Sequence, residues 1–94
     1  MHDKVLMSQA IDGLNKYFKK ILPINSSVGT FHYQKDSGVY YLLIWANEND
    51  VKDKIKKHLN KLFGFSDMYE DQGLLIHTVS RENLEEIAVL GKLY

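Results

Sequence analysis

Residues 28–46 read VGTFHYQKDSGVYYLLIWA and form the most clearly patterned stretch of the chain. Residues 28–34 and 39–46 are rich in β-branched and aromatic side chains, which favour extended strands. Between them lies Asp36-Ser37-Gly38, a turn sequence in which glycine can adopt the positive φ of a tight turn. The stretch therefore predicts a β-hairpin.

Helical patterns flank this hairpin on both sides. Before it, apolar residues recur at steps of three and four over about residues 3–22, a helix that Asp3 or Ser8 could start and Pro23 ends. After it, polar residues 47–50 offer several caps for a second helix, which Gly64 closes. The apolar stripe of this second helix consists of Val51, Ile55, Leu59 and Leu62.

The remaining residues repeat the hairpin-then-helix order. A short strand near residues 67–70, a turn at Asp71-Gln72-Gly73 and a strand over 74–79 predict a second hairpin. Ser80 is a suitable cap for a last helix, with Gly91 as its expected end. The two glycine turns lie 35 residues apart. This spacing indicates either an internal repeat or simply the turn that any such unit needs.

The expected order is α-β-β-α-β-β-α within a single domain of residues 1–94. It comprises an N-terminal helix at about 3–22 and two β-β-α units at about 28–63 and 67–91. We expect an α+β two-layer sandwich, with a four-stranded, mainly antiparallel sheet and helices mostly on one face.

Composition bears on several classes of function. Twelve Lys/Arg residues balance twelve Asp/Glu residues over the whole chain, which argues against an acidic nucleic-acid mimic or a strongly basic nucleic-acid binder. The absence of cysteine excludes disulfides, thiolate metal sites and cysteine nucleophiles. The longest apolar run, residues 39–46, is far shorter than the roughly 20 residues of a membrane helix. We expect a cytoplasmic protein with no membrane partner.

The first hairpin predicts a candidate interaction surface. If its loop has three residues, Tyr33 pairs with Tyr41, Phe31 with Leu43, and Gly29 with Trp45. One face of the hairpin then carries five large side chains: Phe31, Tyr33, Tyr41, Leu43 and Trp45. The opposite face is aliphatic and suits helix packing.

Three interpretations of that aromatic face remain open at this point. The first helix could cover it, so that its side chains are core. It could instead bind another protein or a second copy of this chain, since Tyr and Trp are favoured at interface hot spots. It could also stack a ligand or a nucleobase.

A second candidate surface is cationic. Lys52, Lys56, Lys57 and Lys61 lie on the second helix and could contact nucleic acid or an acidic partner. A lysine-rich helix face is also the ordinary solvent-exposed face of an amphipathic helix. The single arginine, Arg81, argues against phosphate recognition, for which arginine is preferred.

Residues with catalytic chemistry form no motif. The four histidines are His2, His32, His58 and His77; only His32 and His77, in strands of different hairpins, could meet as a metal-binding pair. The serines sit at turns or caps, and no glycine-rich phosphate loop is present. We expect no catalytic residues, no metal and no cofactor, and hence a protein that is not an enzyme.

The element order resembles, at a distance, that of class I type III secretion chaperones, small dimeric α/β proteins with one more strand. The chain lacks their strongly acidic character. Its richness in Lys, Asn, Ile and Tyr is typical of AT-rich bacterial or phage genomes. The sequence therefore favours a small inhibitor, immunity or chaperone-like accessory protein that acts through the aromatic face, with a homodimer as one form of that interaction. Nucleic-acid binding is the alternative, followed by a histidine-based metal protein or enzyme.

Overall fold

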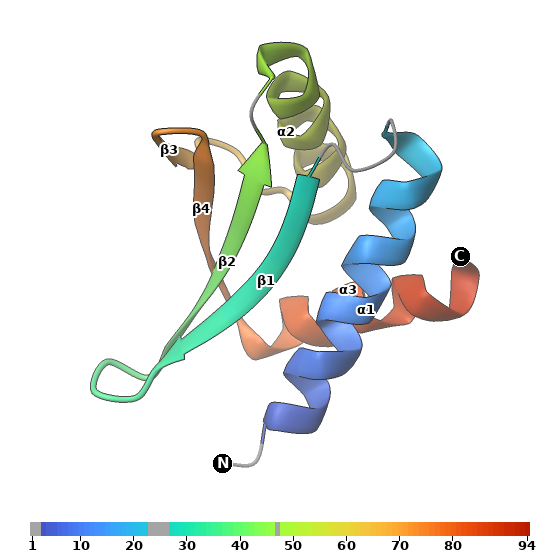
Figure 1. Ribbon diagram of the computed structural model, residues 1–94. Helices are drawn as coiled ribbons and strands as arrows, with labels where there is room; N and C mark the ends of the chain where they lie inside the picture. Colours follow the sequence, from blue (N-terminus) through green and yellow to red (C-terminus); the bar gives the residue numbers. More distant parts are fainter. Residues whose placement is uncertain (1–2, 23–26, 47) are drawn as a thin grey trace.

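A computed structural model describes residues 3–22, 27–46 and 48–94 of the chain, and its elements follow the predicted order. Figure 1 shows one sheet with the helices packed beside it. The elements are α1 (Lys4–Ile21), β1 (Ser27–Gln34), β2 (Val39–Ala46), α2 (Asn49–Phe63), β3 (Tyr69–Asp71), β4 (Leu74–Val79) and α3 (Arg81–Leu93).

Local sequence signals account for two helix ends, whereas α1 and α2 begin after Asp3 and Glu48 without a side-chain cap hydrogen bond. Gly64 follows α2 in the left-handed conformation, with φ of 73°, and its N–H donates to the carbonyl of Asn60. Ser80 caps α3 in a reciprocal arrangement with Asn83: the Asn83 N–H donates to Ser80 Oγ, and the Ser80 N–H donates to the Asn83 side chain. These two predicted signals are confirmed, whereas Pro23 and Asn47 lie outside the described residues.

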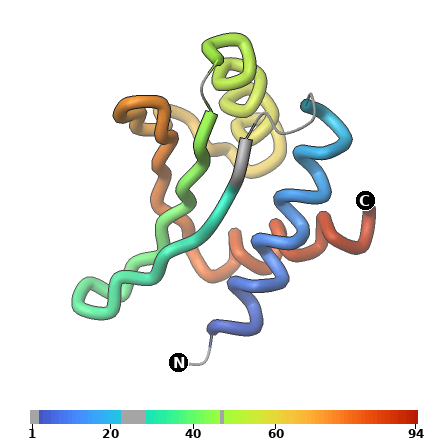
Figure 2. The backbone as a smooth tube through the Cα atoms, viewed as in Figure 1, coloured from blue at the N-terminus to red at the C-terminus, as the bar shows by residue number. Residues whose placement is uncertain are grey.

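Gly91 does not end the last helix as expected. The helix continues through it to Leu93, and Gly91 instead lies where α3 crosses α1. Figure 2 shows this crossing, with α3 running behind the middle of α1. The close approach of the two backbones depends on Gly13 of α1, beside which Gly91 lies, and local sequence does not distinguish such a position from a helix end.

The sheet is antiparallel throughout, in the order β1-β2-β4-β3. Strands β2 and β4 lie at its centre, so the second hairpin joins the first through β4. One edge is therefore formed by β1, of eight residues, and the other by β3, of three.

The predicted register of the first hairpin was wrong by one residue. Tyr33 pairs with Tyr40 and Phe31 with Leu42. The loop consists of four residues, 35–38, because the Gly38 N–H donates to the carbonyl of Gln34 at 2.8 Å. Since side chains alternate between the faces of a strand, this shift moves Phe31 and Tyr33 onto the face of Leu42.

The helices cover that face. On the edge strand β1, Gly29 leaves the space that the side chain of Leu14, from α1, occupies. Leu42, Ile44 and Leu75 are fully buried there. The core is completed mainly by α1, α2 and α3 residues, including Leu14, Phe18, Ile55, Leu59, Leu84 and Ile87.

Candidate functional site

The sheet face opposite the helices, here called the open face, carries an exposed apolar surface. Trp45 retains 52% of its accessible surface and Tyr69 retains 63%. Between them, Leu43 and Ile76 are only partly covered. The described side chains of the open face come from all four strands: Thr30, His32, Gln34, Val39, Tyr41, Leu43, Trp45, Tyr69, Asp71, Leu74, Ile76 and Thr78.

Strand pairing makes the apolar residues contiguous. Leu43 of β2 pairs with Ile76 of β4, which pairs in turn with Tyr69 of β3. Trp45 pairs with Leu74 in the next row. Side chains in directly paired positions lie about 5 Å apart and interact. The result is a strip of large apolar groups across three strands.

The open face is also nearly free of charge. Among its described side chains, Asp71, at the corner formed by β3, is the only Asp, Glu, Lys or Arg. A partner could therefore cover the strip without burying an unpaired charge, which would cost several kcal/mol.

The five predicted interface residues do not share one face. Tyr41, Leu43 and Trp45 lie together on the open face. Phe31, with 7% of its surface exposed, belongs to the core on the helix side. Tyr33 also lies on the helix side, where its ring packs against Tyr40 with centroids 4.7 Å apart. The predicted single aromatic face was wrong because it depended on the three-residue loop; the interface role of these residues stays a prediction.

Sequence reasoning missed the contribution of the second hairpin to the open face. Leu74, Ile76 and Tyr69 extend the strip beyond β2. The alternation in residues 74–79 shows which side chains share a face. It does not show which strand of the first hairpin pairs with β4, so the combined surface could not be assembled from sequence.

The lysines of α2 are partly engaged within the protein. Lys52 is buried, and its Nζ lies 2.6 Å from Glu70 Oε2. Lys56 Nζ lies 3.1 Å from Glu70 Oε1. Hydrogen bonds from these two lysines lower the pKa of Glu70 below its ordinary value. Of the four predicted contact lysines, Lys57 and Lys61 remain exposed.

The structure does not bring His32 and His77 together. His32 is exposed on the open face, whereas His77 lies on the helix side, stacked on Phe65 with ring centroids 4.5 Å apart. His77 Nδ1 donates to the Thr78 carbonyl. Within residues 3–22, 27–46 and 48–94, no group of three or more His, Asp or Glu side chains is placed to hold a metal ion.

A partly buried polar contact links α1 and α2. The Tyr17 hydroxyl and Nδ1 of His58 share a hydrogen bond of 2.6 Å. Burial lowers the pKa of His58, and the neighbouring Lys54, Lys61 and Lys57 lower it further. Burial, followed by the effect of Tyr94, raises the pKa of Tyr17. Both shifts favour a neutral pair at this contact between α1 and α2.

None of the helices in the described part of the chain is both long enough and apolar enough to cross a membrane. Comparisons of the chain with protein-family models, with curated proteins and with solved structures found no match.

Proposed function

We propose that the protein is a non-enzymatic binding module whose open face covers a partner protein or a second copy of the chain. The observation that carries this proposal is the exposure of Trp45 and Tyr69 at either side of Leu43 and Ile76 on an almost uncharged sheet surface. Helix packing on the other side explains the core, and it leaves this surface without an internal role.

The size of the open face supports the proposal. Strand spacing and rise give the whole open face, polar residues included, a footprint of roughly 400 Å², and the apolar strip covers part of it. The largest apolar patch on a typical monomer is about 300–600 Å² and is often functional. Trp and Tyr provide rigid anchors of the kind that dominate interface energies.

Nucleic-acid binding is less well supported. The lysines of α2 lie on the helix side of the sheet, as their contact with Glu70 requires, and so cannot share a surface with Trp45. Phosphate binding and base stacking would therefore act on opposite sides of the molecule. A binding constant that falls steeply with salt would favour this alternative.

The experiment compares the wild type with a Tyr41→Ser/Trp45→Ser variant. Native mass spectrometry and sedimentation velocity over a range of concentrations report self-association, and hydrogen exchange locates the protected surface. We expect a complex whose protection maps to β2 and β4 on the open face, and its loss in the variant. Tyr33→Ser is the control variant, because Tyr33 is exposed on the helix side of the sheet. Phe31→Ala is not a suitable control, because Phe31 belongs to the core.

Two results would contradict the proposal. One is a complex that forms equally well in the wild type and the double variant while both remain folded by circular dichroism. The other is a wild-type protein that stays monomeric and binds only proteins that the double variant also binds.

A further inference from the structure

The outer edge of β1 is a second candidate binding element, separate from the open face. In an antiparallel strand, alternate residues direct their backbone N–H and C=O groups away from the paired neighbour. Gly29 is such a residue in β1, because both its backbone groups bond to a side chain outside the sheet, that of Asn15. By alternation, Phe31 and Tyr33 also direct their backbone groups outward.

The edge is closed at one end and open at the other. Asn15 of α1 satisfies Gly29: its Nδ2 donates to the Gly29 carbonyl, and its Oδ1 accepts from the Gly29 N–H at 3.2 Å. For Phe31 and Tyr33, no comparable partner exists among the described residues. An exposed strand edge of this kind is a template for pairing with another extended chain.

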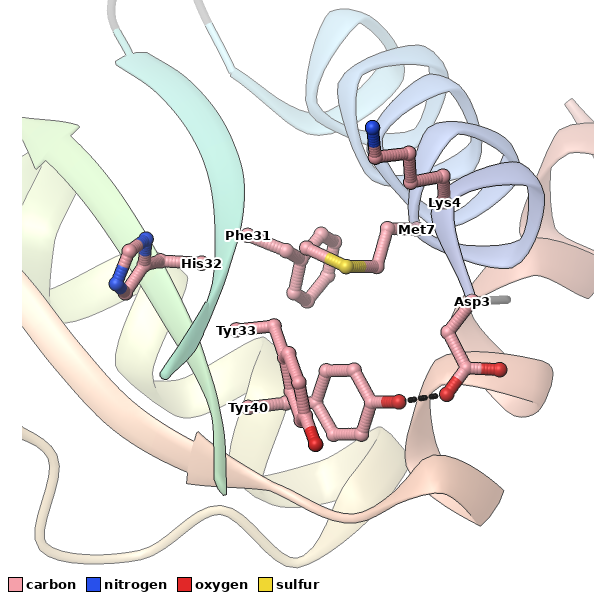
Figure 3. Close-up of a pocket in the computed structure, with 7 residues that line it drawn as sticks. All are labelled: Asp3, Lys4, Met7, Phe31, His32, Tyr33 and Tyr40. Atoms are coloured by element: carbon pink, nitrogen blue, oxygen red, sulfur yellow. Dashed lines mark hydrogen bonds between the residues drawn. The ribbon is translucent and has the colours of Figure 1, made fainter. Parts of the chain in front are cut away.

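A pocket of about 380 Å³ lies beside this open part of the edge. Figure 3 shows it between the first turns of α1 and the hairpin, with Met7 and Phe31 on one side and Tyr33 and Tyr40 on the other. A volume in this range accommodates a large side chain. The pocket adjoins the strand edge because Phe31 and Tyr33 contribute to both.

Two polar side chains at the pocket, Asp3 and Tyr40, contact each other, and His32 also lines it. The Tyr40 hydroxyl donates to Asp3 Oδ2, and Arg81 Nη1 lies 2.7 Å from Asp3 Oδ1. The Asp3 carboxylate thus has a cation beside it within the protein, although its Oδ1 accepts no hydrogen bond from the described residues. Lys4 is exposed at the rim and contributes a positive charge.

We propose that this groove binds a short extended peptide from another protein, which adds a strand to the edge of β1. The peptide backbone pairs with Phe31 and Tyr33, and one large apolar side chain enters the pocket. An acidic residue next to that side chain complements Lys4. Recognition of this type combines main-chain hydrogen bonds for affinity with a side-chain pocket for specificity.

The length of the open edge favours a peptide over a second copy of the chain. Pairing of two full β1 strands would need the whole edge, and Asn15 occupies the Gly29 end. The part left open begins at Phe31 and runs only as far as the hairpin loop. A short segment fits this space, whereas full-length pairing with another eight-residue β1 strand would have to displace Asn15.

The probe is a phage-displayed library of random ten-residue peptides, selected on the folded protein and followed by synthesis of the enriched peptide. We expect an apolar residue with an acidic neighbour, and the largest amide shifts at Phe31 and Tyr33 in NMR spectra. Methylation of alternate peptide nitrogens should weaken binding by about ten-fold or more, since each removes a ladder hydrogen bond. The other nitrogens should tolerate methylation.

Protein variants separate this site from the open face. Met7→Trp fills the pocket and should weaken binding by about ten-fold or more, and Lys4→Glu, at an exposed position, by about three-fold or more. Tyr41→Ser/Trp45→Ser should bind the peptide as the wild type does. If Met7→Trp fails to fold, Lys4→Glu and the methylated peptides still test whether the peptide binds in this groove.

Four outcomes would overturn the proposal. They are a library that yields no peptide above the unselected background, binding that is insensitive to methylation, binding lost only in the open-face variant, and edge-to-edge dimerisation in place of peptide binding. A wild-type protein that binds the peptide but shows no association through the open face would instead contradict only the function proposed above.

Discussion

Gly13 of α1 lies directly against the backbone of α3 at Ile87. A β-carbon at position 13 would lie 2.5 Å from the Ile87 carbonyl oxygen and 2.9 Å from the backbone nitrogen of Gly91. Backbone atoms cannot move aside as a side chain can, so α1 and α3 cross this closely only because residue 13 is glycine. This crossing holds the first and last helices together.

Gly13→Ala should therefore destabilise the protein, even though alanine is the better helix former by about 1 kcal/mol. We expect a net loss of about 1–3 kcal/mol, as for other overpacked sites, measured by urea unfolding. Gly91→Ala is the matched control, because its nearest contact would be at 3.4 Å, an ordinary van der Waals distance. Equal effects of the two substitutions would contradict the packing argument.

The corrected register predicts opposite responses on the two faces. Phe31→Ala removes a side chain that is 7% exposed and should cost about 3–5 kcal/mol. Trp45→Ala removes one that is 52% exposed and should cost about 1 kcal/mol or less. Chemical denaturation of both variants tests this directly. Similar costs would instead support the three-residue loop, which places both residues on one face.

Glu70 should make stability depend on acid pH. Its pKa is lowered in the folded protein by hydrogen bonds from Lys52 and Lys56. Between the folded-state pKa and the ordinary value of 4.5, the unfolded chain therefore binds more protons than the folded protein. The stabilisation that Glu70 provides is complete above pH 4.5 and is lost as the pH falls through the folded-state pKa. Glu70→Gln should flatten this part of the profile of unfolding free energy.

Asp12→Asn provides the control for Glu70. Asp12 is ion-paired with Lys16 at 3.2 Å, but both side chains are largely exposed, so the pair is screened by water. Its removal should leave the acid profile close to that of the wild type. A Glu70→Gln profile with the wild-type slope would show that Lys52 and Lys56 do not hold the carboxylate.

His58 should produce a second pH effect, nearer neutrality. Burial and nearby lysines lower its pKa from 6.5, so its neutral form is favoured in the folded state. The stabilisation is complete above 6.5 and is lost as the pH falls through the lower folded-state pKa. NMR titration should show the lowered pKa, and His58→Gln should remove the corresponding slope. His32→Gln, at an exposed position, should leave that slope in place.

Asn15 should protect the edge of β1. Asn15→Ala leaves the buried backbone groups of Gly29 without their partner and should cost about 1–3 kcal/mol. It also lengthens the open edge, so association should increase with concentration in sedimentation experiments. Asn60→Ala, at an exposed position in α2, should change neither property.

Signals that act within a few residues were predictable from sequence. The cap formed by Ser80, the left-handed end at Gly64 and the turn glycine Gly38, with φ of 66°, are all as expected. Each depends on local backbone geometry and on hydrogen bonds between neighbours, so one sequence window contains the necessary information.

Features that depend on one residue of loop length or on distant contacts were not predictable. The turn sequence allows three or four loop residues, and the choice assigns Phe31 to the core or to the surface. The pairing of β2 with β4 likewise joins residues that no local pattern relates.

The sequence by itself determined the element order, because apolar periodicity and turn residues act locally. Tertiary structure alone decided the faces, the contact of Gly13 with α3 and the groove beside β1. These features arise because long-range packing selects one register and one helix crossing among several that the local sequence permits equally.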